Sequence, residues 1–186
     1  MATVVIYKTR YGATQQYAEW IGKALGADVF NIRKFNKDQF ANYDTVILGG
    51  GIYAGNVNGI SLISKNFEQL KDKNLIIFTV GMKDPSKDYN KKSIQQSLLK
   101  VLTPAMLDKI KVFSLRGALD TDKINVLHYS MLKILVQMVD NDEETMDADE
   151  IKTFHAAFEK PQNFVEMDQI KPLVNYVKTM PYLNKK

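Results

Sequence analysis

A loop close to the amino terminus combines hydroxyl groups, a cation and a glycine in an order that suits a phosphate. Residues 9–14 read Thr-Arg-Tyr-Gly-Ala-Thr and lie between an apolar, β-branched run and a segment with helical periodicity. The amide N–H groups and the positive dipole of a helix start attract an anion, and Thr9, Arg10 and Thr14 could add donors. The alternative is an ordinary helix start with Thr14 as its N-cap. Neither G-x-G-x-x-G nor G-x-x-x-x-G-K-[ST] occurs here, so two other nucleotide motifs are excluded.

Two further loops follow apolar runs and could hold a flat ligand. Residues 49–56 open with three glycines that would let the backbone approach a ring closely, with Ile52 and Tyr53 covering one face of it. Residues 81–85 offer backbone amides to a polar ring edge, and Lys83 could stabilise negative charge there. The alternatives are a flexible turn with Tyr53 in the core and a plain strand-to-helix connection.

The elements that must position these loops alternate between strand and helix. Apolar runs predict strands at residues 2–7, 28–32, 45–48, 75–80 and 111–115, and periodicity predicts helices at 14–25, 60–70, 93–102, 124–139 and 167–178. This alternation favours an α/β fold, a parallel sheet with helices on both faces. Ligands of such sheets bind beyond the carboxyl ends of the strands, where the three loops would meet. We expect residues 1–186 to form a single domain.

Composition narrows the chemistry. The chain has no cysteine among its 186 residues, which excludes disulfides, iron–sulfur clusters, thiol catalysis and Cys-based zinc sites. Redox chemistry would therefore need a borrowed cofactor, and no metal site is predicted. No secretory signal and no apolar run of about 20 residues is visible, so a cytoplasmic location is the simplest expectation.

Charge is distributed unevenly. The formal net charge is +4, yet residues 140–150 hold seven acids and no base, which leaves +11 on the rest of the chain. A basic body could favour nucleic acid, anionic lipid or an acidic partner, or could be a solvated surface of scattered lysines. No RNA-binding signature or basic helix is present, so nucleic acid is not expected. The acidic stretch lacks an EF-hand pattern and is predicted to be a solvated loop.

The phosphate loop resembles that of the flavodoxin family, matching its pattern at Thr9, Gly12 and Thr14, while Tyr11 stands where a threonine is usual. The resemblance implies a doubly wound five-stranded sheet of order 2-1-3-4-5 and flavin mononucleotide (FMN) as cofactor. Because Tyr11 interrupts the hydroxyl pattern, Arg10 and backbone amides are expected to carry more of the phosphate binding. The implied cofactor-binding residues are Thr9, Arg10, Tyr11, Gly12, Ala13 and Thr14 for the phosphate, and Gly50, Gly51, Ile52, Tyr53, Ala54, Gly55, Gly81, Met82 and Lys83 for the ring.

A closer resemblance is to the branch of that family that includes menaquinone-dependent protoporphyrinogen dehydrogenase. It rests on Thr-Arg-x-Gly-x-Thr at residues 9–14, on Gly-x-x-Ile-Tyr-Ala-Gly at 49–55, and on Gly-Ala-Leu at 117–119 followed by an apolar helix and the acidic residues 143–145. Simple flavodoxins lack such a helix after the last strand. We therefore expect a helical insertion at about residues 120–150.

Two functions remain open. One is an FMN-binding redox protein that passes electrons to a partner protein. The other is an FMN-dependent enzyme that oxidises a porphyrinogen and reduces a quinone. Residues 49–59 contain no acid and Lys83 is near, which would stabilise an anionic reduced flavin and raise its potential, unlike a low-potential carrier. The flavin itself transfers electrons, so no catalytic side chain is predicted, and His128 and His155 are interpreted as surface or packing residues.

The predicted helix at residues 124–139 is apolar over much of its circumference. One side carries Ile124, Leu127, Met131, Leu135 and Met138 at helical spacing. Such a helix is usually buried in a core or in a homodimer. The alternatives are contact with a porphyrin or quinone, and peripheral contact with the inner face of the membrane.

Overall fold

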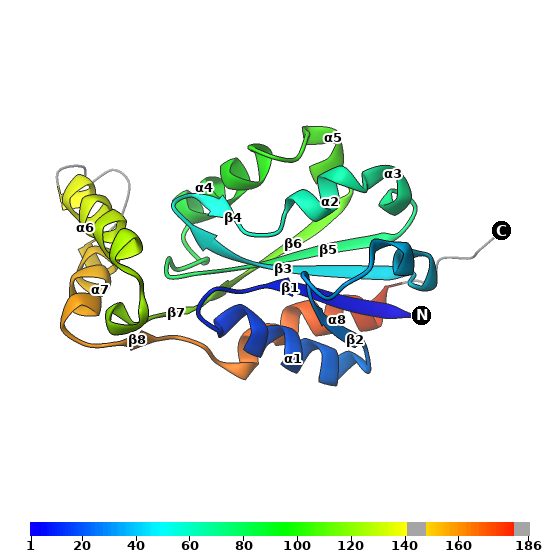
Figure 1. Ribbon diagram of the computed structural model, residues 1–186, viewed down its shortest axis with the longest axis horizontal. Helices are drawn as coiled ribbons and strands as arrows, with labels where there is room; N and C mark the ends of the chain where they lie inside the picture. Colours follow the sequence, from blue (N-terminus) through cyan, green and yellow to red (C-terminus); the bar gives the residue numbers. More distant parts are fainter. Residues whose placement is uncertain (141–147, 181–186) are drawn as a thin grey trace.

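The protein is built on a parallel sheet. The computed structural model describes residues 1–140 and 148–180, apart from the side chains of residues 135 and 138–140. Its five parallel strands are β1 (Thr3–Lys8), β2 (Asp28–Asn31), β3 (Thr45–Tyr53), β5 (Asn74–Gly81) and β6 (Ile110–Arg116). They lie in the order β2-β1-β3-β5-β6, so the predicted 2-1-3-4-5 winding is confirmed (Figure 1). A short strand β4 (Asn56–Val57) pairs antiparallel to the end of β3.

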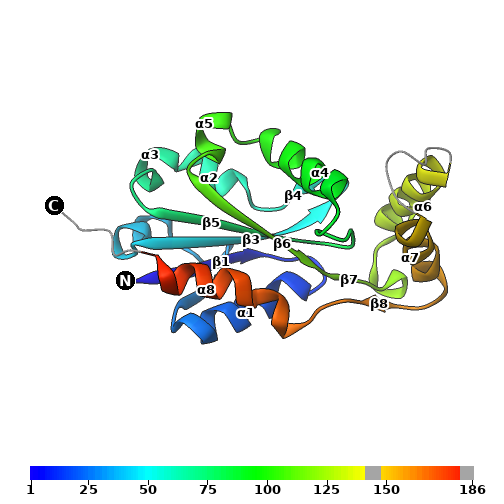
Figure 2. The ribbon, with the colours of Figure 1, turned by 180° about the vertical axis from the view of Figure 1, so that it is seen from behind.

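Helices cover both faces of the sheet (Figures 1 and 2). Helices α1 (Ala13–Leu25) and α8 (Lys171–Thr179) pack on one face, and α2 (Ser61–Lys65), α3 (Phe67–Leu70), α4 (Asp88–Leu99) and α5 (Pro104–Leu107) lie on the other. Successive β1 side chains point to opposite faces, so Val4 and Ile6 join one buried cluster while Val5 joins the other. This explains why β1 reads as a continuous apolar run.

Several predicted boundaries shift because of contacts that the local sequence does not show. Strand β3 continues through the three glycines to Tyr53, so the predicted loop at 49–56 begins inside the strand. The predicted helix at 60–70 is interrupted at Asn66, whose side-chain amide donates to the carbonyl of Leu62 at 2.8 Å. The 3-10 helices η1 (Lys37–Asn42) and η3 (Met167–Ile170) were not predicted; η3 replaces the first turn of the helix expected at 167–178.

The insertion after β6 lies beyond the carboxyl edge of the sheet, at the left of Figure 1. It comprises β7 (Ala118–Leu119), η2 (Thr121–Lys123), α6 (Val126–Asp140), α7 (Ala148–Glu159) and β8 (Gln162–Asn163). Strands β7 and β8 pair antiparallel at its base.

The insertion differs from the sequence-based expectation in two respects. It extends to Asn163 rather than to about residue 150, because α7 and β8 belong to it. The acidic stretch at 140–150 was expected to be a solvated loop, but its end forms the start of α7 and Glu150 is buried. Residues 141–147 lie outside the described residues. None of the helices described is long and apolar enough to cross a bilayer.

Candidate ligand-binding site

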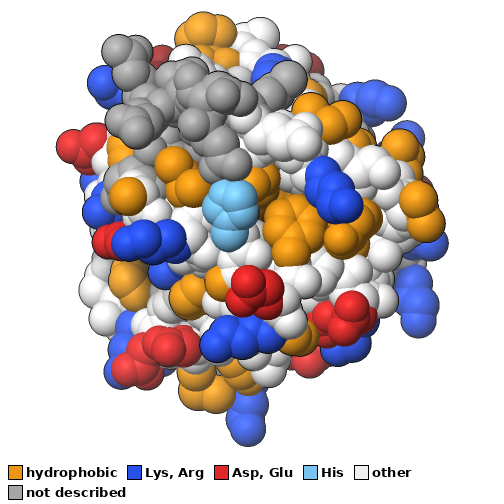
Figure 3. Space-filling view, turned by 90° about the vertical axis from the view of Figure 1, so that its left-hand side faces the viewer, with side chains coloured by type: hydrophobic (Ala, Val, Ile, Leu, Met, Phe, Trp, Pro, Cys, Tyr) orange, Lys and Arg blue, Asp and Glu red, His pale blue; other side chains and the backbone are white. Residues whose placement is uncertain are grey.

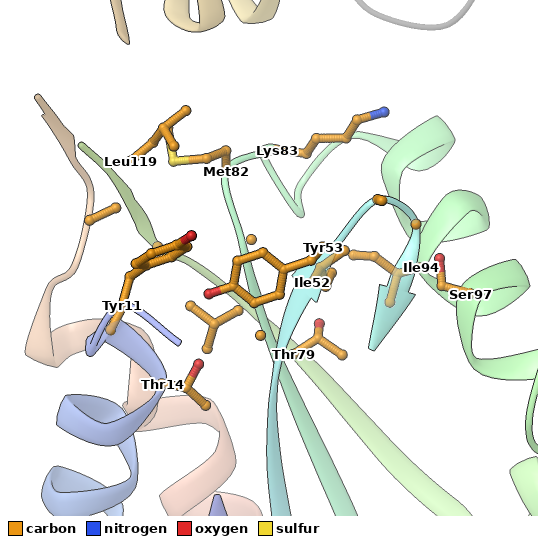
Figure 4. Close-up of a pocket in the computed structure, with 18 of the residues that line it drawn as sticks. Tyr11, Thr14, Ile52, Tyr53, Thr79, Met82, Lys83, Ile94, Ser97 and Leu119 are labelled. Carbon is orange, nitrogen blue, oxygen red and sulfur yellow. The ribbon is translucent and has the colours of Figure 1, made fainter. Parts of the chain in front are cut away.

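A cavity of about 590 Å³ opens at the carboxyl ends of β1, β3, β5 and β6, where the three predicted loops meet the insertion (Figure 4). Its volume is within the usual range for small-molecule sites. The predicted residues that line it are Thr9, Tyr11, Ala13, Thr14, Gly51, Ile52, Tyr53, Ala54, Gly55, Gly81, Met82 and Lys83. The predicted residues Arg10, Gly12 and Gly50 do not contribute to its lining.

The first loop presents a helix amino terminus to the cavity. Gly12 has a φ of 97°, a conformation that favours glycine, and occupies the N-cap of α1. Its amide donates to the Thr9 hydroxyl at 3.0 Å, and the first intrahelical bond joins the Gln16 amide to the Gly12 carbonyl. The amides between these positions therefore have no acceptor within the helix. Thr14 lies inside the helix and is 2% exposed, so its interpretation as an N-cap is wrong.

The second loop is a tight hairpin between β3 and β4. Ala54 and Gly55 both have positive φ, of 46° and 66°, and the Lys100 ammonium donates to the Gly55 carbonyl at 2.8 Å. Gly50 serves the hairpin itself, because a Cβ there would lie 2.5 Å from the Asn58 carbonyl oxygen. The hairpin projects the Tyr53 ring into the cavity, as Figure 4 shows, and burial raises the pKa of its phenol to about 12.

The third loop contributes Gly81, Met82 and Lys83. Figure 4 shows the Met82 side chain beside Leu119 of the insertion, and the Lys83 side chain extending away from Tyr53. Burial lowers the pKa of the Lys83 ammonium, and the Glu150 carboxylate opposes that shift. Because the Lys83 side chain extends away from Tyr53, any stabilisation of negative charge on a ligand by its ammonium would act from a distance.

His128 belongs to the site, although it was interpreted as a surface or packing residue. Arg10 donates to its Nε2, the Tyr11 hydroxyl lies 2.5 Å from its Nδ1, and its ring stacks on that of Tyr53 with centroids 6.0 Å apart. Because a guanidinium only donates, His128 must present an unprotonated ring nitrogen to Arg10. Partial burial and the Arg10 charge lower the pKa of His128.

Arg10 itself is directed to His128 and lies over the Tyr53 ring at 5.5 Å, rather than lining the cavity. The sequence gives no signal for this pairing, because the two residues are 118 positions apart. His155 is exposed on α7.

The insertion adds an apolar wall. Leu119, Met131, Leu132 and Phe154 line the cavity, and the last of these is 6% exposed. The predicted apolar side of residues 124–139 is divided: Ile124 and Met131 line the cavity, whereas Leu127 is 67% exposed. The side chains of Leu135 and Met138 lie outside the described residues.

Hydroxyl groups that were not predicted from the sequence form part of the cavity floor. Thr79 of β5 is fully buried and donates to the Ser114 hydroxyl of β6 at 3.1 Å, and Ser97 of α4 lines the same cavity. For Thr79 and Ser114, the sequence signal was a polar residue near the end of an apolar run. Across the described part of the chain, no three His, Asp or Glu side chains are arranged to hold a metal ion.

A parallel sheet wound in both directions, with a cavity at its carboxyl edge and a helix amino terminus facing that cavity, defines the doubly wound α/β class. Within that class the chain belongs to the flavodoxin domain family, whose model (Flavodoxin_5) matches residues 4–146.

Individual proteins are similar at low identity. The protoporphyrinogen IX dehydrogenase (quinone) of Escherichia coli strain K12 is 22% identical over 152 residues, covering 78% of this chain and 84% of that protein. A putative flavoprotein structure from Bacteroides eggerthii is 19% identical with a TM-score of 0.45, covering 61% of this chain and 85% of that one. A Fusobacterium nucleatum flavodoxin bound to FMN is 18% identical with a TM-score of 0.38, covering 67% and 75%.

Proposed function

We propose that the chain binds FMN in this cavity and transfers electrons through it. The observation that carries the proposal is the convergence of three loops, from β1, β3 and β5, on one cavity that combines a helix amino terminus with aromatic walls. Membership of the flavodoxin domain family supports the same assignment.

The residues present fit the chemistry of such a ligand. The amides at the start of α1 and the hydroxyl of Thr14, which is buried against the cavity, suit a phosphate. The Tyr53 ring and the backbone of Gly81 and Met82 suit an aromatic ring with a polar edge. When bound, the flavin would supply one- and two-electron transfer. The protein would bind it, orient it and exclude water from one side.

The test is uptake of FMN by the purified protein, followed by its visible spectrum and by titration. Thr14→Val removes one hydroxyl donor to a charged group, so we expect affinity to fall by about 10- to 100-fold. Thr179→Val on α8, where the hydroxyl bonds only within its own helix, is the matched control. A folded protein that takes up no FMN would refute the proposal.

We propose as the second candidate an enzyme that oxidises a porphyrinogen and reduces a quinone. The apolar wall from the insertion favours it, because Met131, Leu132 and Phe154 extend the cavity beyond the three loops. The similarity to the E. coli quinone-dependent dehydrogenase supports it. The FMN-loaded protein, mixed anaerobically with protoporphyrinogen and a menaquinone analogue, should form three quinols for each porphyrin, because the porphyrinogen gives up six electrons and each quinone accepts two. A loaded protein inert in this assay but reduced by a partner protein would favour the carrier.

The outer side of α6 suits the inner face of a membrane. Val126 and Leu127 are 83% and 67% exposed, and the exposed Lys123 nearby pairs with Asp120 at 2.7 Å. Figure 3 views this end of the molecule, where hydrophobic side chains gather among charged ones. Exposed apolar residues at the end of a helix favour contact with a lipid surface. Leu127→Asp should reduce co-flotation with anionic vesicles, whereas Val101→Asp, at a site distant in sequence, should not. Loss of a dimer in sedimentation instead would assign this side to a second copy.

A further inference from the structure

Glu150, at the start of α7, is a buried carboxylate that contacts the third loop. It is 5% exposed, and among the described residues no other charged side chain is buried. Its Oε1 accepts from the Asp84 amide at 2.6 Å and from the Asn90 side-chain amide at 2.7 Å, and its Oε2 accepts from the Tyr89 hydroxyl at 2.7 Å. All three donors are neutral and belong to the connection between β5 and α4 or to the first turn of α4.

These bonds fix the backbone on both sides of Asp84. Glu150 holds the Asp84 amide, while the Asn90 side chain, fully buried, donates to the Asp84 carbonyl at 2.8 Å as well as to Glu150. The flanking residues Lys83 and Pro85 both line the cavity. The carboxylate therefore restrains the loop at the point between two cavity-lining residues.

Because Glu150 is buried, the carboxylate and the loop stabilise each other. A buried carboxylate without hydrogen bonds is costly, so Glu150 requires the loop in this conformation, and the loop amide gains a charge-assisted acceptor. The Glu150 carboxylate also opposes the lowering of the Lys83 pKa by burial.

Docking of the insertion does not depend on this contact alone. The Phe154 and Val136 side chains pack against Met82 of the third loop and against Leu119. Within the insertion itself, the Thr121 hydroxyl donates to the Ala157 carbonyl at 2.9 Å near the other end of α7. Glu150 adds a polar contact with the backbone of the loop, at the Asp84 amide, to the apolar contact at Met82.

We propose that Glu150 is a positioning residue that holds the loop from Gly81 to Lys83 in the conformation that binds the edge of the flavin ring. The inference rests on the proposed function. It extends the site to a residue of the insertion that does not line the cavity.

Three variants distinguish the effect of the Glu150 hydrogen bonds from that of its charge and from a general loosening of the insertion. Glu150→Gln keeps both acceptor bonds of Oε1, and its amide can donate to the Tyr89 hydroxyl, so the geometry survives while the charge is lost. Glu150→Met has similar size and makes none of these bonds. Thr121→Val loosens the insertion at a site away from the loop.

The measurements are the dissociation rate of FMN and the visible spectrum of the bound flavin, with circular dichroism to confirm folding. We expect Glu150→Met to release FMN about tenfold faster with a shifted spectrum, and the other two variants to stay within about twofold of wild type.

The outcomes are distinct. If wild type takes up no FMN, the proposed function fails, and this inference fails with it. If wild type binds FMN and folded Glu150→Met releases it at the same rate, the inference alone is refuted. Equal acceleration in Thr121→Val would also overturn it, because the effect would then come from loosening of the insertion rather than from loss of the bonds to the loop. If Glu150→Met does not fold, Glu150→Gln decides, because it keeps the hydrogen bonds without the charge. FMN release about tenfold faster from Glu150→Gln would contradict the inference, and release within about twofold of wild type would support it.

Discussion

Gly49→Ala tests whether the first glycine of the 49–51 run serves the ligand or the core. The backbone of Gly49 does not have a positive φ, so an alanine is conformationally allowed there. On backbone entropy alone, the substitution would stabilise the protein by about 0.4–1 kcal/mol. If the glycine mattered only for close approach of a ligand, the ligand-free protein should follow this expectation.

The packing around Gly49 predicts the opposite sign. Gly49 pairs with Phe78 across β3 and β5, and a Cβ at Gly49 would lie 2.2, 2.6 and 2.8 Å from the Cζ, Cε1 and Cε2 atoms of the Phe78 ring. The ring is fully buried, so it cannot move away without disturbing its neighbours. Overpacking of this kind costs about 1–3 kcal/mol. We expect the free energy of unfolding to fall by this amount.

Urea unfolding of the ligand-free protein measures the effect by linear extrapolation. Phe78→Leu makes room for the new methyl group, so the double variant should recover part of the loss, with a coupling energy of about 1–3 kcal/mol. An unchanged or increased stability of Gly49→Ala would refute the reasoning. So would strict additivity of the two substitutions.

Two further predictions concern contacts that join distant parts of the chain. Tyr17→Phe removes the hydroxyl that donates to the Arg116 carbonyl at 2.7 Å, so stability should fall by about 1–3 kcal/mol in urea unfolding, and a change below about 0.5 kcal/mol would contradict this. His128 should titrate below its unfolded value of 6.5, because burial and Arg10 lower its pKa. The folded state then binds fewer protons than the unfolded state, so this contribution to stability is present above about pH 6.5 and is lost as pH falls through the folded pKa. Proton NMR of the ring would detect the midpoint, and Arg10→Gln should raise it; a wild-type midpoint at or above 6.5 would disprove the assignment.

Local sequence patterns predicted the frame of the molecule and the three loops that contribute to its cavity lining. Buried parallel strands are nearly continuous apolar runs, so the runs that became β1, β5 and β6 could be recognised without their neighbours. Helix periodicity and the terminating Gly26, which has a φ of 61°, fixed the end of α1. The placement of ligand loops at the carboxyl edge followed from the winding rule for such sheets.

Contacts between distant residues decided the remainder. Gly49 is enclosed by the Phe78 ring only because β3 and β5 pair in one register, which a local window cannot reveal. His128 reaches Tyr11 across 117 positions, so neither residue carries a local signal of the other. Glu150 reads as part of an acidic, solvated run, and its burial is possible only because the fold brings three donors to it. The sequence by itself determined the five parallel strands and the loops that follow them, since these depend on periodicity and on backbone conformation, and its resemblance to the flavodoxin family implied the strand order. Tertiary structure alone decided which polar side chains face the cavity, because burial and hydrogen-bond partners arise from packing between segments.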